Sequence, residues 1–350
     1  MLAISAITNV PIVAEDTLII FDEIQELKRG IASLKYFYER APQYHICVAG
    51  SLLGITLRQG ESFPVGKVNT IQMYPMTFTE FLIARGKNLM AKLLENKDWQ
   101  TLSTLHDVLI QMLREYYMVG GMPEAVNVFI ETNDANSVRE VQREILLAYK
   151  NDISKHTTKE QSHRIAMVWN SMPSQLSKEN KKFLYGVVKK GGRAKEFELA
   201  IQWLIDAGLI IKVGRVTTPS MPLKVYEDLS AFKLYLLDVG LLGAMAEINP
   251  VQLLLPNNMK ESKGMFTENF VCTQLATQFN SSLFYYVKEN STLEIDFFVQ
   301  KETQIIPIEV KANDNATPSL NKLIKEDKYP DVKYGIKLGY KNIGFNGNFY

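Results

Sequence analysis

Residues 17–23 read TLIIFDE, an uninterrupted apolar run that ends in two acids. A short apolar run of this kind is typical of a buried strand in a parallel sheet. The spacing of apolar residues in 31–40 predicts a helix, and residues 44–49 (YHICVA) read as a second buried strand. Strand, helix and strand in succession form a βαβ unit, so the sequence predicts an α/β fold with a parallel sheet.

The predicted sheet is a partial one. Only residues 1–16 precede its first strand, and a lone βαβ unit cannot cover its own sheet. We therefore expect the sheet to lack its first strands and to expose an apolar edge. Such an edge favours self-assembly of the chain or pairing with a separate N-terminal fragment.

The composition is that of a globular protein without a strong field of one sign. Of 350 residues, 46% are hydrophobic and 22% are charged, and the formal net charge is +1. Global attraction to nucleic acid is therefore not expected, while a local basic face is compatible with this balance. No apolar run reaches the ~20 residues that span a bilayer, so we expect a cytoplasmic protein without a membrane partner. Cys47 and Cys272 are predicted to be buried thiols, and no zinc site is predicted.

The pattern along the chain predicts four parts. Residues 1–85 contain the parallel unit, and residues 86–172 are helical. Residues 173–230 combine two helices with a β-ribbon, as in a winged helix. Residues 231–350 contain a helix followed by three or four strands, which predicts a C-terminal α/β domain.

The two acids after the first strand have the order that nucleotide chemistry requires. A buried parallel strand would place Asp22 at the carboxyl edge of the sheet, where nucleotides bind. There an Asp holds Mg²⁺, and the following Glu23 orients a water for attack on a γ-phosphate. The alternative is a strand that ends in an acid capping the next helix.

Three segments together resemble one protein family. FDEIQ at 21–25, AGSLLG at 49–54 and YPMTFTEF at 74–81 are similar to segments of bacterial and archaeal AAA-type P-loop ATPases with a C-terminal domain of unknown function. The resemblance implies ATP and Mg²⁺ as cofactors. It makes Asp22 the metal carboxylate, Glu23 the catalytic glutamate and Ser51 the polar sensor residue. Lys67 stands where the family usually has an arginine, which puts an arginine-type role in doubt.

The phosphate-binding loop of that family is missing from the sequence. Its pattern GxxxxGK[ST] cradles phosphates with backbone amides and a lysine. The nearest string, GESFPVGKV at 60–68, has one residue too many between its glycines and ends in valine. We expect ATP binding to be weak or absent, as in an N-terminally truncated ATPase or one with a misassigned start.

A second set of acids lies near the C-terminus. Glu268 opens an amphipathic helix, and two short segments follow, EIDF at 294–297 and IEVK at 308–311. Strand alternation places Glu294 with Asp296 on one face, and Glu309 with Lys311 on one face. Adjacent strands would then bring together Asp296, Glu309 and Lys311.

These residues resemble the PD-(D/E)xK nuclease arrangement. The resemblance implies that Asp296, Glu309 and the accessory acid Glu268 bind Mg²⁺, with Lys311 placed to activate water near a scissile phosphate. Residues 231–350 would then form a nuclease-like domain similar to a restriction endonuclease. Three alternatives remain open: active cleavage, a nuclease-like fold with little or no cleavage, and plain charge pairing at strand edges.

The middle of the chain contributes a basic segment and a glycine-rich turn. The basic residues suit either contact with DNA or a solvated helix face; they are Lys178, Lys181, Lys182, Lys189, Lys190, Arg193 and Lys195. GGMPE at 120–124 resembles a signature of the same ATPase family, and we interpret it as a turn that requires positive φ.

Three functions follow from these observations. The first is an AAA-type ATPase whose ATP turnover acts on a DNA-acting or regulatory C-terminal module. The second is a metal-dependent nuclease with a decayed ATPase part. The third is a DNA-binding or interaction protein without enzymatic activity.

Overall fold

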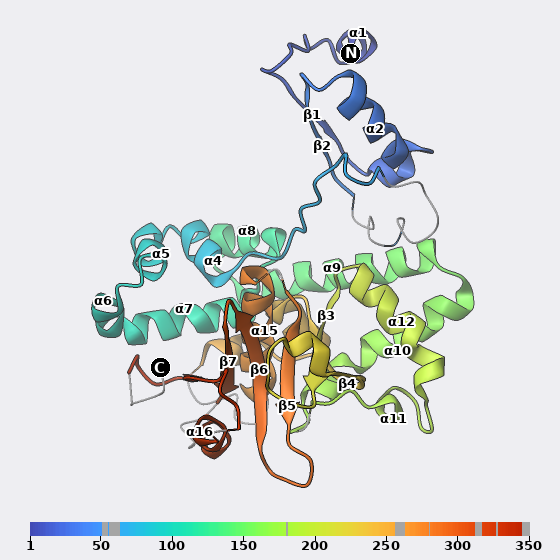
Figure 1. The fold of residues 1–350 in the computed structure, drawn as a ribbon. Coiled ribbons are helices and arrows are strands. Elements are labelled where there is room, and N and C mark those ends of the chain that lie inside the picture. The colour runs from blue at the N-terminus through green and yellow to red at the C-terminus, as the bar shows by residue number, and fades with distance from the viewer. Residues whose placement is uncertain are drawn as a thin grey trace. The chain divides into compact units, whose positions relative to one another are not determined.

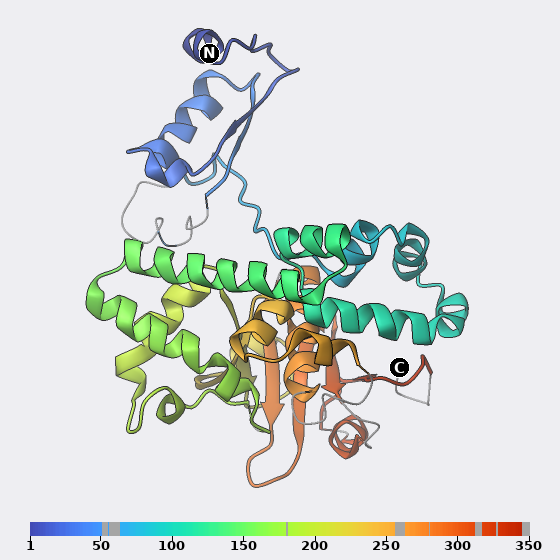
Figure 2. The same ribbon diagram turned by 180° about the vertical axis from the view of Figure 1, so that it is seen from behind.

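The computed structural model describes residues 1–50, 55, 64–179, 181–255, 263–279, 281–311, 317–326 and 328–344. Contacts divide the chain into two units, residues 1–73 with 202–208 and residues 74–201 with 209–350. Each unit combines helices with strands, so the predicted α/β class is confirmed (Figures 1 and 2).

The N-terminal unit is built on a parallel strand pair. Its described elements are α1 (Leu2–Thr8), β1 (Leu18–Phe21), the 3₁₀ turn η1 (Ile24–Glu26), α2 (Gly30–Arg40) and β2 (His45–Val48). Strands β1 and β2 run parallel, with Leu18 opposite His45 and Phe21 opposite Val48. The βαβ unit predicted from the sequence is therefore confirmed.

The strands of this unit are less buried than their sequences predict. Ile19 is 8% exposed, whereas Leu18 is 58% and Ile20 63% exposed, because alternate residues of β1 point to opposite faces. Helix α2 contributes buried Ile31 and Leu34. The expected burial of Cys47 was wrong, since its thiol is exposed on β2, while Cys272 is buried as expected.

The second unit opens with a helical segment. Its described helices are α4 (Phe78–Ala84), α5 (Asn88–Glu95), α6 (Trp99–Thr104), α7 (His106–Val119), α8 (Pro123–Thr132), α9 (Ala135–His156), α10 (Lys159–Leu176), α11 (Tyr185–Val188) and the first part of α12 (Ala194–Asp206), of which the residues from Gln202 on are assigned to the first unit. Helix α4 begins with a capping box, in which the Thr77 hydroxyl accepts the Glu80 N–H and the Glu80 carboxylate accepts the Thr77 N–H. The YPMTFTEF segment therefore contains a helix start.

The strands of the second unit form one mixed sheet. The strands are β3 (Ile210–Val216), β4 (Glu227–Leu236), β5 (Leu283–Val287), β6 (Glu294–Lys301), β7 (Gln304–Val310) and β8 (Ile336–Leu338), in the order β4-β3-β5-β6-β7-β8. β3 pairs parallel with β5 and β7 with β8, while the other neighbours are antiparallel. The β3–β4 ribbon, placed by sequence in a winged helix, thus shares a sheet with the C-terminal strands, and the border expected at residue 230 lies within β4.

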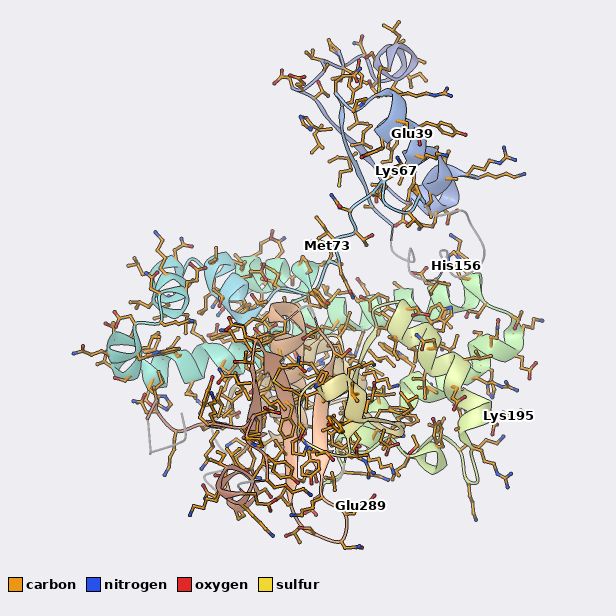
Figure 3. The ribbon with its side chains drawn as sticks, in the orientation of Figure 1. Glu39, Lys67, Met73, His156, Lys195 and Glu289 are labelled. Atoms are coloured by element: carbon orange, nitrogen blue, oxygen red, sulfur yellow. The ribbon has the colours of Figure 1, made fainter. Side chains whose placement is uncertain are left out.

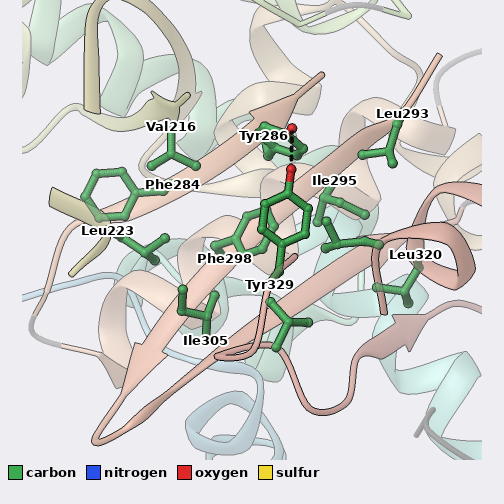
Figure 4. Close-up of a cluster of buried hydrophobic side chains, with 12 residues drawn as sticks. Val216, Leu223, Phe284, Tyr286, Leu293, Ile295, Phe298, Ile305, Leu320 and Tyr329 are labelled. Carbon is green, nitrogen blue, oxygen red and sulfur yellow. Dashed lines mark hydrogen bonds between the residues drawn. The ribbon is translucent and has the colours of Figure 1, made fainter. Parts of the chain in front are cut away.

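Further helices accompany this sheet. They are α13 (Val239–Met245), α14 (Pro250–Leu254), α15 (Lys263–Gln278) and α16 (Pro318–Lys325), with a 3₁₀ turn η2 (Leu223–Tyr226) between β3 and β4. Helix α15 packs against β4, β3 and β7, and α16 packs against β6 and β7. Figure 4 shows the apolar cluster beneath α16, where Leu320 meets strand residues such as Ile295 and Phe298.

The GGMPE segment is the turn between α7 and α8. Gly120 has φ +76°, which confirms the predicted positive φ, and Pro123 is the first residue of α8. Gly121 has a different reason: a Cβ there would lie 2.1 Å from the Met76 carbonyl oxygen. Met76 N–H in turn donates to the Gly121 carbonyl at 2.7 Å. Residues 74–78 therefore pack against this turn through the contact between Met76 and Gly121.

A buried carboxyl group holds the same turn from the other side. Asp238 accepts the Gly121 N–H at 2.6 Å and, as the N-cap of α13, the Leu241 N–H at 2.8 Å. Burial raises the pKa of Asp238 to about 6, even though these N–H donors favour its ionised form. One side chain thus ties the α7–α8 turn to the start of α13.

The close approach at Gly121 predicts a large effect of one methyl group. Gly121→Ala should lower the free energy of unfolding by roughly 3 kcal/mol, because the Met76 backbone cannot move aside cheaply. Gly264→Ala is the matched control, since no atom lies within 4 Å of its Cβ position in α15. That change should be neutral or stabilising by up to about 1 kcal/mol. Equal effects in denaturant titrations would contradict this account of the turn.

The raised pKa of Asp238 predicts a pH dependence of stability. The folded protein holds a proton on Asp238 between pH 4 and 6, where the unfolded chain has released it. The contribution of Asp238 therefore increases as pH falls. The free energy of unfolding of the wild type minus that of Asp238→Asn should rise between pH 7 and pH 4. A difference that stays constant or falls over this range would show that the carboxyl group is ionised in the fold.

Candidate functional site

The acids of the first strand lie where the sequence predicts them. Asp22 and Glu23 follow β1 directly at its carboxyl end, and both side chains are exposed. Glu23 has a left-handed backbone with φ 47°, and its N–H donates to Asp22 Oδ1 at 3.0 Å. The Gln25 side-chain amide donates to the Glu23 carboxylate. Next to them, Ile24 N–H donates to the Ala49 carbonyl at 3.0 Å, which ties the turn to the end of β2.

Ser51 and Lys67 are the other two residues of this unit that the family resemblance singles out. Ser51 lies outside the described residues. Lys67 places its ammonium 3.8 Å from the Glu39 carboxylate and 4.6 Å from the centre of the Tyr38 ring (Figure 3). Its charge is therefore directed to α2, and a single ammonium lacks the paired donors of the arginine usual in the family.

The second candidate site lies at the C-terminal sheet, where Glu268 of α15 is 9% exposed. Its Oε1 accepts from the Lys181 ammonium at 2.5 Å, and its Oε2 accepts from the Tyr235 hydroxyl at 3.1 Å. Lys181 precedes α11, and Tyr235 lies on β4. Both oxygens of this predicted metal ligand are thus engaged by groups from the middle of the chain.

The acids of β6 share a buried lysine. Lys233 of β4 is 1% exposed, and its ammonium donates to Glu294 Oε1 at 2.8 Å. The same ammonium lies 3.8 Å from Asp296 Oδ1 and 4.8 Å from the centre of the Tyr285 ring. Asp296 Oδ2 accepts the Val310 N–H at 2.8 Å, which joins this acid to β7. Lys233 is therefore the cation next to both acids of β6.

The acid and lysine of β7 pair with each other, as strand alternation predicts. Lys311 Nζ lies 2.8 Å from Glu309 Oε1, and Glu309 Oε2 accepts the Leu320 N–H at 3.2 Å. Glu309 is 2% exposed, whereas the Lys311 side chain is 30% exposed. The charge pair considered among the alternatives is present, and it also fixes the start of α16.

The electrostatics of this set follow from burial and from the number of charges. Burial, followed by the charge of Glu268, raises the pKa of Asp296 to about 7. Burial opposes the charge of Lys233, but Asp296, Glu268 and Glu294 together raise its pKa above the usual value. Lys233 therefore stays an ammonium, and Asp296 is the acid that takes up a proton near neutral pH.

Burial also acts on Lys311, where it is outweighed by hydrogen bonding and charge. Its hydrogen bond with Glu309 and the nearby carboxylates raise the pKa of Lys311. A lysine held in the ammonium form cannot accept a proton from water. General-base action by Lys311 is therefore disfavoured in this arrangement.

The carboxylates do not fit a divalent metal as they are arranged. Mg²⁺ prefers six oxygen ligands at about 2.0–2.1 Å, whereas these acids face lysines, a tyrosine and backbone N–H groups. Within the described ranges, no group of three or more His, Cys, Asp or Glu is placed so that it could hold a metal ion. Asp296, Glu309 and Glu268 form a charge-paired set with Lys181, Lys233 and Lys311.

Three residues that contact these acids, namely Lys181, Lys233 and Tyr235, are not predicted to do so by the sequence pattern. Lys181 falls within the predicted basic surface, and neither Lys233 nor Tyr235 has a predicted role. A signal is present: residues 231–236 (AFKLYL) place one lysine inside an apolar strand. A charge in such a run predicts a buried partner, because an isolated buried ammonium is costly.

The basic segment divides between the interior and the surface. Lys181 is 6% exposed and paired with Glu268, so it cannot contact DNA. Lys189 pairs with Glu196 at 2.7 Å. Lys190, Arg193 and Lys195 are exposed around the start of α12, where Figure 3 labels Lys195. A local basic face is therefore present, and it is smaller than the sequence predicts.

Comparison with known proteins identifies three regions. Residues 2–82 match an AAA domain, residues 110–252 match a domain of unknown function (DUF8612), and residues 263–350 match a further domain of unknown function (DUF4143). No curated protein matches the chain. These matches support an AAA-type, ATPase-like protein. Lys181 and Lys233 lie in the 110–252 region, while their carboxylate partners lie in the 263–350 region.

A search of the described helices for a segment long and apolar enough to cross a membrane found none.

Proposed function

We propose that this chain is an AAA-type ATP-binding protein in which Asp22 and Glu23 supply the magnesium and water-orienting half of the nucleotide site. The observation that carries the proposal is their position at the carboxyl end of β1, next to parallel β2, in a segment that matches an AAA domain. Ser51 would act as the polar sensor residue of the same site.

The local geometry supports separate roles for the two acids. Asp22 accepts the Glu23 N–H, and this bond holds its carboxylate beside the strand end, where it can bind Mg²⁺ or a water of its hydration shell. Glu23 is exposed, and its contact with the Gln25 amide orients its carboxylate. When bound, Mg-ATP would bring the phosphates and the metal, and Glu23 would orient the attacking water.

The test compares two substitutions at this edge. Asp22→Asn should weaken binding of fluorescent Mg-ATP by about tenfold or more, because the amide cannot replace the metal carboxylate. Glu23→Gln should leave binding unchanged and lower any hydrolysis by roughly 10² to 10⁴. The titration extends to millimolar nucleotide so that weak binding is measured.

Glu26→Gln is the matched control, since Glu26 is an exposed acid of the adjoining turn η1. It should bind Mg-ATP like the wild type. Binding that is the same in the presence of EDTA, or that Asp22→Asn leaves intact, would contradict the proposed role of this edge.

A second candidate function, contact with DNA, is favoured by the basic face around α12. Lys190, Arg193 and Lys195 are exposed within six residues of one another, a spacing that suits neighbouring phosphates. This contact would make the middle segment of the chain, around the start of α12, the part that acts on DNA.

Charge removal tests the second function. Changing Lys190, Arg193 and Lys195 to Gln together should weaken DNA binding and reduce the slope of log K against log salt by about 0.9 for each phosphate that the protein no longer neutralises. The control changes three exposed lysines of another region, Lys87, Lys92 and Lys97, to Gln. Equal weakening in both triple variants would show general charge attraction and not a DNA-binding face.

A further inference from the structure

We propose that the C-terminal carboxylate set carries its own cation: Lys233, assisted by Lys181, occupies the position that a divalent metal would take in a nuclease-like site. The set would then act as a structural junction between residues 110–252 and 263–350. This inference is independent of the ATP-binding function, since it concerns a different unit of the chain.

The position of the Lys233 ammonium carries the first step. It lies 2.8 Å from Glu294 Oε1 and 3.8 Å from Asp296 Oδ1, so one cation serves both acids of β6. A metal bound between these acids would stand within about 4 Å of the ammonium, where like charges repel strongly in a medium of low dielectric constant. Binding would require the ammonium to leave.

Burial makes that departure costly. Lys233 is 1% exposed and lies in the middle of β4, with its ammonium near the face of the Tyr285 ring. Moving the charge from its carboxylates without water to receive it leaves an unpaired buried ion, which typically costs several kcal/mol. The ammonium is therefore a fixed part of the site.

The carboxylates of Glu268 and Glu309 are also engaged by donors on both of their oxygens. Glu268 receives the Lys181 ammonium and the Tyr235 hydroxyl, one on each oxygen. Glu309 receives the Leu320 N–H on one oxygen and pairs with Lys311 through the other. A metal would have to compete with such donors at each of the three predicted ligands, Asp296, Glu309 and Glu268.

The origin of the charges shows what the arrangement does. The cations Lys181 and Lys233 come from the 110–252 region, and Glu268, Glu294 and Asp296 come from the 263–350 region. One ion pair joins Lys181 to Glu268 on α15, and the other joins Lys233 on β4 to Glu294 on β6. They join the two family regions at the same sheet in which β3 pairs with β5.

Binding of Mn²⁺ to the full chain, without nucleotide, tests the proposal. The experiments use the Asp22→Asn background, so that the N-terminal acids do not contribute. Free Mn²⁺ is measured by electron paramagnetic resonance. The parent and its Asp296→Asn derivative should bind the same amount of Mn²⁺, because the carboxylate is already paired. One stoichiometric Mn²⁺ bound by the parent and absent from Asp296→Asn would overturn the proposal.

Removal of the ammonium gives the converse result. Lys233→Met keeps an unbranched side chain, and it should gain about one bound Mn²⁺ that the further change Asp296→Asn removes. Lys212→Met is the matched control on β3, where the ammonium lies 4.9 Å from the centre of the Phe232 ring, and it should gain none. A folded Lys233→Met protein without added Mn²⁺ binding would overturn the proposal.

Thermal unfolding covers the case in which Lys233→Met is unstable. The proposal expects Mn²⁺ to raise the melting temperature of Lys233→Met and to leave that of the parent unchanged. A Lys233→Met protein that Mn²⁺ does not stabilise would count against a cation position at Lys233. Nicking of supercoiled DNA is measured in parallel, and Mn²⁺-dependent nicking by the parent that Asp296→Asn abolishes would also overturn the proposal.

Discussion

The second unit depends on one electrostatic constraint: carboxylates buried at a sheet must be matched by cations buried with them. Four acids and three lysines meet there, and the carboxyl in excess is the one whose pKa rises toward neutrality, Asp296. Because Lys233 lies within β4 and its acids lie on β6, its charge constrains where β4 stands relative to β6, with β3 and β5 between them in the sheet. The apolar layers of the sheet could be filled in several ways, whereas the charged layer has few acceptable arrangements.

The turn between α7 and α8 shows a steric constraint of the same strictness. Gly121 lets the Met76 backbone approach, and Asp238 receives the N–H that this approach leaves pointing inward. Two sequence segments that resemble family signatures, YPMTF and GGMPE, are thus the two halves of one contact. Their pattern is explained by packing.

Much of the fold could be predicted from local patterns. The parallel βαβ unit, the helix at α15 and strands β5 to β7 follow from periodicity, and alternation correctly placed Glu309 beside Lys311. What the sequence did not reveal depends on distant partners. Lys233 and Glu294 are 61 positions apart, so no local pattern connects them. The interpretation of Lys181 as a surface charge failed for the same reason, and the exposure of Cys47 depends on which face of β2 is covered.

Glu23 and Asp22 illustrate a different limit. Their position after β1 could be predicted from the apolar run, but the left-handed backbone at Glu23 could not, because its sequence favours no such conformation. That conformation and the bond to Asp22 give the pair a defined geometry. The function that we propose for this pair is a part in ATP binding.

The parallel pairing of β3 with β5 has a consequence for inheritance. The two family regions meet inside a single sheet, so a gene rearrangement that replaced one of them would have to bring strands and charges that suit the other. A donor region with acids but without the matching lysines would place uncompensated charge in the interior. The two regions should therefore be inherited together in one gene, even though they match separate families.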